Sequence, residues 1–323
     1  MGTDRMQMPR ALITGATGFA GSHLADLCLA SGWEVHGTSL KAPEGRAGVA
    51  VSMHQIDLSE PGAFERVLTA VLPDRIFHLA GQASVATAWA DPAATLISNI
   101  VTTQRVLEAA HIRSPEAKLL IVSSGEVYGR PPLEVQPIRE AQPLRPADPY
   151  AVSKVSVEYL ALQHVLAFGM HVVRVRPFNH IGPRQRRGFV VADFAAQIAA
   201  IERGEQPPFV RVGNLQAARD FTDVRDTVRG YLMALEDGVP GEVYNVCSGR
   251  AVQIAELLRM LLAACTVPVK VISDPAKQRP LDTPVLTGSA DALSQQTGWE
   301  ARIPLDRTLA DTLAYWRERS SPP

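Results

Sequence analysis

The sequence predicts an α/β protein built around a doubly wound parallel sheet, with a smaller second domain interleaved with it. The first observation is that short apolar strands alternate with helical patterns over residues 10–176. The second is a glycine-rich loop placed directly after the first strand. The third is that the alternation stops after Arg176. Strands that alternate with helices at this spacing favour a parallel sheet with helices on both faces.

The elements of the first part follow one another in regular order. Short apolar runs predict strands at 10–14, 34–38, 51–55, 75–79, 118–123 and 172–176. Apolar residues at helical spacing predict helices near 19–30, 61–71, 92–110 and 150–168.

After Arg176, strands and helices no longer alternate regularly. We expect a loop at 179–188, helices at 189–203, 224–236, 254–264 and 305–317, and strands at 209–212, 242–246 and 269–272. The pattern predicts a sheet domain of residues 1–177 with about 220–248. The smaller C-terminal domain then comprises 178–219 and 249–323.

Composition narrows the class of protein. The 323 residues are 46% hydrophobic, which is ample for a large core. The net charge of −1 does not indicate binding to nucleic acid or to an anionic membrane. The first ten residues lack the apolar core of a signal peptide, and no apolar run approaches the roughly 20 residues that span a bilayer. Cys28, Cys247 and Cys265 lie far apart without metal-ligand spacing, which indicates free thiols in a reducing compartment. We expect a cytoplasmic protein.

The glycine-rich loop is a candidate dinucleotide site. Gly15, Gly18 and Gly21 form a Gly-x-x-Gly-x-x-Gly pattern between the first strand and the first helix. The first glycine permits a tight turn, the second lets backbone N–H groups approach a pyrophosphate, and the third lets the helix pack closely. A glycine-rich turn without a ligand is the alternative, but the position in the alternating pattern favours a Rossmann-type site. The predicted contacts are Gly15, Thr17, Gly18, Phe19, Ala20 and Gly21.

The end of the second strand favours NADPH over NADH. Enzymes that use NAD place an acidic residue there to hold the ribose hydroxyls. Here Thr38, Ser39 and Lys41 carry hydroxyls and a positive charge, with Arg46 nearby, and this set suits a 2′-phosphate. Asp57, which precedes Leu58 after the third strand, either accepts from the adenine amine or caps a helix.

Two further segments carry acid–base chemistry. Tyr150 and Lys154 are four residues apart, so a helix places both on one face. A nearby ammonium is expected to lower the phenol pKa from about 10 towards neutrality. Ser124 follows the fifth strand, at the edge where open parallel sheets bind ligands, and its hydroxyl can hydrogen-bond a substrate carbonyl.

Together, the glycine loop, Ser124 and the Tyr150/Lys154 pair resemble the extended short-chain dehydrogenase/reductases over essentially the whole chain. The resemblance implies that Tyr150 is the acid/base and that Ser124 polarises the substrate oxygen. Lys154 would also grip the nicotinamide ribose. It further implies that Asn99 is structural, although Thr102 replaces the family's glycine, and that the cofactor is lined by Leu79, Ala80 and Gly81.

The C-terminal motifs resemble the GDP-6-deoxy-D-mannose reductases, densely from about residue 177 to 299. That resemblance implies reduction of the 4-keto group of GDP-4-dehydro-6-deoxy-D-mannose to GDP-D-rhamnose. It also implies a homodimer formed through the helices near 92–110 and 150–168. Arg184 stands where a glycine is expected. The implied substrate-binding residues are Asn179, Arg187, Val190, Arg219 and Arg279; ordinary surface ion pairing is the alternative for Arg219, next to Asp220.

Competing functions remain open at this point. Glu126 stands two residues before Tyr128, where sugar-nucleotide 4,6-dehydratases of the GDP-mannose type carry a base. A sugar-nucleotide epimerase is a further option within the same fold. A non-catalytic dinucleotide sensor is disfavoured because a sensor has no need of Ser124, Tyr150 and Lys154. No metal is expected, because these side chains and a nicotinamide would supply the chemistry.

Overall fold

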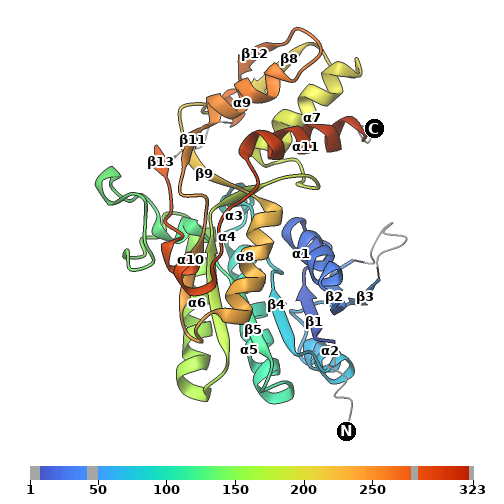
Figure 1. The fold of residues 1–323 in the computed structure, drawn as a ribbon, viewed down its shortest axis with the longest axis vertical. Coiled ribbons are helices and arrows are strands. Elements are labelled where there is room, and N and C mark those ends of the chain that lie inside the picture. The colour runs from blue at the N-terminus through green and yellow to red at the C-terminus, as the bar shows by residue number, and fades with distance from the viewer. Residues whose placement is uncertain (1–7, 42–49, 278–282, 320–323) are drawn as a thin grey trace.

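A parallel seven-stranded sheet forms the centre of the molecule, as the sequence predicts (Figure 1). The computed structural model describes residues 8–41, 50–277 and 283–319. The strand order is β10-β6-β5-β4-β1-β2-β3, and every pairing between these neighbours is parallel. The strands are β1 (Arg10–Thr14), β2 (Glu34–Ser39), β3 (Val51–Gln55), β4 (Arg75–His78), β5 (Lys118–Val122), β6 (Val172–Pro177) and β10 (Val243–Val246).

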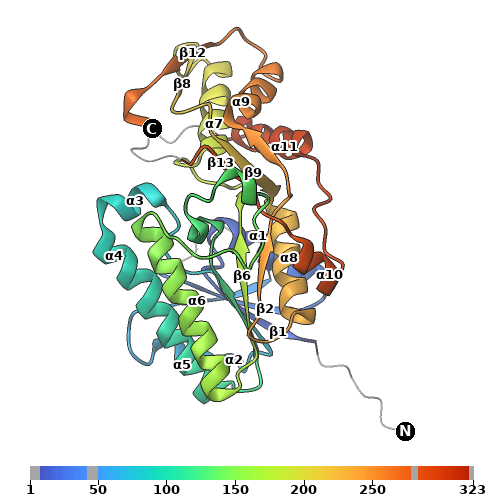
Figure 2. The same ribbon diagram turned by 90° about the vertical axis from the view of Figure 1, so that its left-hand side faces the viewer.

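Helices cover both faces of this sheet (Figure 2). One face packs on α1 (Phe19–Ala30), α8 (Val224–Asp237) and α10 (Asp291–Thr297). The other packs on α2 (Ala63–Val71), α5 (Thr102–Arg113) and α6 (Pro149–Phe168). Each face encloses an apolar cluster, so central strands such as β1 and β5 are buried on both sides and are nearly continuous apolar runs, whereas the edge strand β3 has no buried residue. The short helices α3 (Val85–Ala90) and α4 (Pro92–Leu96) precede α5.

The smaller domain lies above the sheet in Figure 1. Its helices α7 (Val190–Glu202), α9 (Ile254–Ala263) and α11 (Leu305–Arg317) share an apolar cluster. Its central strand β9 (Ala218–Asp223) pairs with β7 (Asn179–Ile181), β11 (Ala251–Gln253) and β13 (Val285–Leu286). A separate pair joins β8 (Phe209–Val212) to β12 (Lys270–Ser273). None of the helices in the described part of the chain is long and apolar enough to cross a membrane.

Several elements differ from the sequence prediction. The helix expected at 92–110 is divided by a π-helical turn, Ile97–Val101, between α4 and α5. The loop expected at 179–188 begins with β7, and β9 was not predicted. The six residues of β9 are all buried although three are charged, so no polar–apolar alternation marks the strand. The domain boundaries stay a prediction; Leu293 and Trp299, from the range assigned to the smaller domain, pack in the cluster of α1 and α8.

Candidate active site

The predicted site residues gather at the carboxyl edge of the sheet. The strand order reverses between β1 and β4, and open α/β sheets bind ligands in the crevice beside such a reversal. The glycine loop follows β1, the segment 79–81 follows β4, and Ser124 follows β5 by two residues. The chain thus brings the proposed cofactor and acid–base segments to neighbouring strand ends.

The glycine loop has the shape that a pyrophosphate requires. Gly15 has a φ of 70°, a left-handed conformation that favours glycine. A Cβ on Gly21 would lie 2.2 Å from the Gly15 carbonyl oxygen, so only glycine lets α1 begin this close to the loop. Gly18 caps α1 without a side-chain hydrogen bond, and Thr17 and Gly18 are exposed. The positive end of the α1 dipole therefore faces outward, a cradle that fits a dinucleotide phosphate.

The end of β2 is tied to this loop. The amides of Gly15 and Ala16 donate to the Thr38 carbonyl at 3.1 and 3.2 Å. The Thr38 side chain is buried and the Ser39 hydroxyl donates to the Lys41 carbonyl at 2.6 Å, so Lys41 is the exposed polar group of the set. Arg46 lies outside the described residues.

Asp57 caps its own turn. Its Oδ1 accepts from the Ser59 amide at 2.7 Å, and the hydrogen bonds from Ser59 lower the pKa of the Asp57 carboxyl. Leu58 is buried in the apolar cluster under α2. Asp57 therefore caps a turn ahead of α2 and not the helix itself, whose N-cap residue is Gly62, and its contact with the adenine amine stays a prediction.

The segment after β4 is held by Asn99. Gly81 has a φ of 145°, and a Cβ there would lie 2.7 Å from the Asn99 Oδ1. That oxygen accepts from the Gln82 amide at 2.8 Å, and the Asn99 Nδ2 donates to the Ser153 hydroxyl at 2.8 Å. The π-helical turn that carries Asn99 thus ties the segment of Leu79, Ala80 and Gly81 to α6, beside Lys154.

Ser124, Tyr150 and Lys154 lie together, each with less than a tenth of its surface exposed. The Lys154 ammonium lies 5.9 Å from the Tyr150 ring centroid and donates to the Val122 carbonyl at 2.8 Å. Burial lowers the pKa of Lys154 to about 8. The pKa of the Tyr150 phenol is raised, chiefly by burial, while a hydrogen bond with Ser124 lowers it. The expected fall of the phenol pKa is therefore wrong for this structure, because burial outweighs the polar neighbours.

Glu126 also acts on this set. It lies in the 3₁₀ turn Gly125–Tyr128 that Ser124 caps, and its amide donates to the Ser124 Oγ at 3.2 Å. Its negative charge raises the pKa of Tyr150. The structure therefore places Glu126 within electrostatic reach of the phenol, and its role as a catalytic base stays a prediction.

The predicted substrate residues line the smaller domain. Asn179 pairs with Phe221 in the register of β7 and β9, which places it near Arg219, two residues earlier on β9. Arg219 is buried and donates to the carbonyls of Ala218 and Thr283 at 2.9 and 2.5 Å. The carboxylate of Asp220 accepts from the amides of Ser248 and Gly249.

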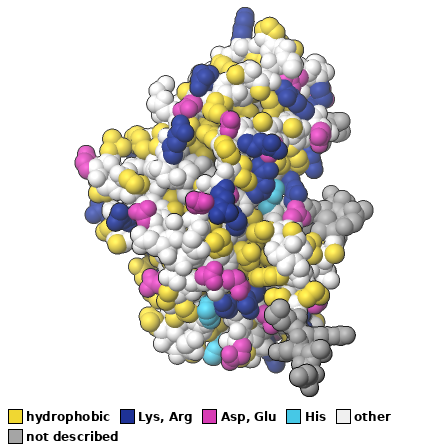
Figure 3. Space-filling model, in the orientation of Figure 1, with side chains coloured by type: hydrophobic (Ala, Val, Ile, Leu, Met, Phe, Trp, Pro, Cys, Tyr) yellow, Lys and Arg dark blue, Asp and Glu magenta, His cyan; other side chains and the backbone are white. Residues whose placement is uncertain are grey.

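The other substrate residues lie at the start of α7. Val190 is the first residue of that helix and is half-buried. Arg187 is 62% exposed, and its Nε lies 3.9 Å from the Asp193 carboxylate. Lys277 approaches the same carboxylate at 3.7 Å. Arg279 lies outside the described residues. Figure 3 shows Lys and Arg side chains gathered where the smaller domain meets the sheet domain.

The loop that carries these residues rests on α1. Arg184, with a φ of 74°, donates to the Asp26 carboxylate at 2.6 Å. The ring of His180 stacks on Phe19 with centroids 5.7 Å apart. The left-handed backbone explains why a glycine is expected at this position, and the ion pair with Asp26 offsets part of the strain.

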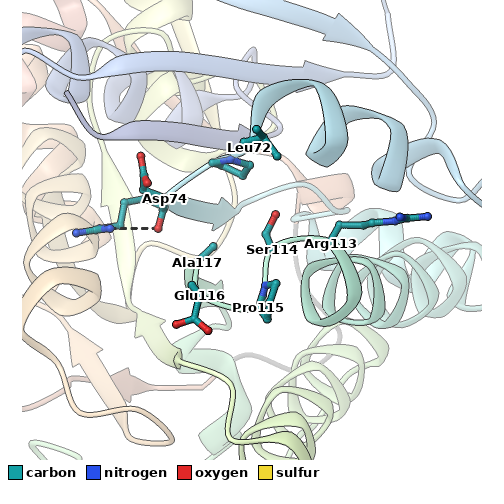
Figure 4. A pocket seen from close by; sticks show the side chains of 9 residues that line it. Leu72, Asp74, Arg113, Ser114, Pro115, Glu116 and Ala117 are labelled. Atoms are coloured by element: carbon teal, nitrogen blue, oxygen red, sulfur yellow. Dashed lines mark hydrogen bonds between the residues drawn. The ribbon is translucent and has the colours of Figure 1, made fainter. Parts of the chain in front are cut away.

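A pocket at the opposite edge contains none of the predicted residues (Figure 4). It lies before β4 and β5, and its lining includes Leu72, Asp74, Arg113, Ser114 and Glu116. Ligands of open parallel sheets bind at the other edge, so this pocket is not the candidate active site.

Comparison with known proteins gives a consistent set of relatives. A family model described as GDP-mannose 4,6 dehydratase matches residues 12–312. The chain is 38% identical over 312 residues to a GDP-6-deoxy-D-mannose reductase of Pseudomonas aeruginosa, covering 96% of this chain and 98% of that protein. It is 27% identical over 346 residues to a GDP-mannose 4,6-dehydratase of Vibrio cholerae, covering 94% and 92%.

Solved structures agree with this. The structure of RMD (GDP-6-deoxy-D-mannose reductase) from Pseudomonas aeruginosa complexed with NADPH matches with a TM-score of 0.84 and 36% identity, covering 97% of this chain and 100% of that one. A UDP-glucose 4-epimerase from Thermotoga maritima matches with a TM-score of 0.85 and 28% identity, covering 96% and 99%.

Proposed function

Because the chain belongs to the extended short-chain dehydrogenase/reductases, in the family that the GDP-mannose 4,6 dehydratase model describes, we propose that it is a GDP-4-dehydro-6-deoxy-D-mannose reductase. The product would be GDP-D-rhamnose. One observation carries the proposal. Ser124, Tyr150 and Lys154 come together at the carboxyl edge of the sheet, in a chain that resembles such a reductase over nearly its whole length.

The acid–base residues divide the work as follows. Tyr150 donates its phenolic proton to the oxygen at C4 of the sugar as negative charge develops there. Its raised pKa supports this role, because the phenol is protonated at neutral pH. Ser124 donates a hydrogen bond to the same oxygen. Lys154 holds a positive charge beside the phenol and supports the ribose of the cofactor.

NADPH is the cofactor that we propose, and NADH is the alternative. When bound, it supplies the hydride that reduces C4. The glycine loop would hold the pyrophosphate, and the residues after β4 would line the nicotinamide side. Lys41, exposed after β2, supports binding of a 2′-phosphate. The likeness to an RMD that was solved with NADPH supports the same choice.

The smaller domain would bind the GDP moiety. Asn179 and Arg219 from paired strands, with Arg187 and Val190 at the start of α7, surround the place that we assign to the diphosphate. Arginine suits this role because its planar fork binds phosphate oxygens in pairs. Arg279 is proposed for the same clamp on the resemblance alone.

The reductase is tested by absorbance at 340 nm with NADPH and GDP-4-dehydro-6-deoxy-D-mannose made in place by a dehydratase. We expect loss of one NADPH for each GDP-deoxyhexose formed. No loss of absorbance would overturn the proposal. The position of Glu126 beside Tyr150 favours one other candidate, a GDP-mannose 4,6-dehydratase. That enzyme would convert GDP-mannose to a keto sugar without added cofactor.

We also propose that the protein is a cytoplasmic homodimer. Large apolar side chains are exposed on α5, on α6 and in the turn before α5: Ile97, Ile112, Tyr159, Leu166 and Phe168. Apolar surface of this kind favours association, and a second copy is the partner that the family resemblance implies. The three free cysteines support a reducing compartment.

A further inference from the structure

A buried ion pair lies behind the acid–base residues. Glu158 on α6 and Arg176 on β6 make two hydrogen bonds, with Nε to Oε1 at 2.9 Å and Nη2 to Oε2 at 2.7 Å. Their side chains are only 1% and 5% exposed. Because desolvation of two charges largely cancels their attraction, such a pair is a poor device for stability alone. Its position therefore calls for another explanation.

The pair holds both ends of one catalytic segment. At the start, the Ser123 hydroxyl donates to the Glu158 Oε1 at 2.5 Å. At the end, the Tyr128 hydroxyl accepts from the Arg176 Nη1 at 2.8 Å and donates to the Asn245 Oδ1 at 2.8 Å. Ser124 and Glu126 lie between these two anchors. A single ion pair thus anchors both ends of the backbone segment that carries Ser124 and Glu126.

The same carboxylate acts on Lys154. Glu158 follows Lys154 by one turn on the same face of α6. Burial lowers the pKa of Lys154, and the charge of Glu158 raises it. The other groups around the ammonium are the Tyr150 ring, the Val122 carbonyl and His78 at the end of β4. Burial and the Lys154 charge lower the pKa of His78 to about 3, so this imidazole is neutral at working pH.

We propose that Glu158 and Arg176 are positioning residues for the acid–base set. The pair clamps the segment that carries Ser124 and Glu126, and the Glu158 carboxylate holds the positive charge of Lys154 beside Tyr150. The inference rests on the proposed function, because positioning matters only where these residues act together on a substrate.

The test is a titration of Lys154 in the intact protein without added ligands. The lysines of the chain are Lys41, Lys118, Lys154, Lys270 and Lys277, so protein labelled with ¹⁵N at lysine Nζ gives a simple spectrum, and Lys154→Arg identifies the signal. In Glu158→Gln we expect the midpoint of Lys154 to fall by about one pH unit or more. In Arg176→Met we expect it to rise, because the Glu158 charge is then uncompensated.

Opposite shifts separate an electrostatic role from structural damage, which both variants share. Unchanged midpoints, or shifts in the same direction, would overturn the proposal. If a single variant does not fold, Glu158→Gln with Arg176→Met removes both buried charges together. Its Lys154 midpoint should also lie below that of the wild type, and an unchanged midpoint would again refute the idea.

Activity supplies the second readout. In Glu158→Gln, the alkaline limb of kcat/KM should move to lower pH together with the Lys154 midpoint. An alkaline limb that stays in place while the midpoint moves would overturn the link to the acid–base set. If the wild type reduces no GDP-sugar, the proposed function has failed, whereas the ligand-free titration still tests the electrostatic part.

Discussion

At the scale of single residues, burial decides what Tyr150 and Lys154 can do. Both side chains are almost enclosed, and burial favours the neutral form of each. The phenol therefore keeps its proton at neutral pH, which suits a proton donor. The ammonium keeps its charge only below a pKa of about 8. The two residues thus work together in a limited range of pH.

Replacement of the donor should separate chemistry from binding. In Tyr150→Phe we expect kcat to fall by about 10²–10⁴-fold, because the phenolic proton is lost. The affinity for NADPH, measured by fluorescence titration, should stay within about twofold. Tyr315→Phe is the control, since Tyr315 lies on α11, outside both the acid–base set and the proposed dimer surface. Unchanged turnover in Tyr150→Phe would rule out Tyr150 as the acid.

The pH dependence follows from the sign of the Lys154 shift. Lys154 is charged below its pKa and neutral above it, so kcat/KM should decrease as the pH rises through about 8. A profile of kcat/KM from pH 6 to pH 10 measures this limb for the free enzyme. A profile that stays flat to pH 10 would show that the charge of Lys154 is not required.

At the scale of elements, the start of α1 couples the two halves of the site. The glycine loop at its N-terminus is the proposed pyrophosphate cradle. Phe19, the first residue of α1, stacks on His180, and Asp26, about two turns further along the helix, accepts from Arg184. A displacement of α1 would therefore disturb both proposed binding sites.

Gly21→Ala should produce that displacement. The added Cβ would meet the Gly15 carbonyl oxygen at 2.2 Å, so the helix must move away from the loop. We expect NADPH affinity to fall at least about tenfold, measured by isothermal titration calorimetry. Gly32→Ala is the control at the other end of α1. Gly32 has a φ of 78° and open space around it, so this substitution should cost about 1 kcal/mol of stability and leave NADPH binding unchanged. Equal losses of affinity in both variants would argue against the cradle.

At the scale of the whole molecule, the exposed apolar side chains of α5 and α6 predict that two chains associate through these helices. Leu166 is 78% exposed in a single chain. A second copy packed on these helices would bury it. We expect the wild type to sediment as a dimer at micromolar concentration and Leu166→Asp to sediment as a monomer, because a buried unpaired carboxylate is costly. Val271→Asp is the control, since Val271 is 45% exposed on β12 of the smaller domain, outside α5 and α6. A monomeric wild type would contradict the prediction.

The sequence by itself determined the features that depend on near neighbours in the chain. The glycine loop, the strand before it and the helix after it are found within about one residue of their predicted limits, because turn glycines and apolar periodicity are local signals. The alternation of strands and helices likewise determined the class of the sheet. Ser124 could be placed at its edge because it follows a predicted strand.

Only the tertiary structure decided the features that depend on distant partners. Strand β9 is enclosed by segments from three other parts of the chain, and this enclosure allows its charged residues to be buried. The strand therefore shows no alternation of polar and apolar residues from which the sequence could predict it. The rise in the pKa of Tyr150 comes from burial, which no spacing in the sequence reports. Glu158 and Arg176 meet across 18 residues, from a helix and a strand. Burial and long-range pairing depend on how the whole chain packs. Periodicity and turn chemistry depend only on residues that are close together in the sequence.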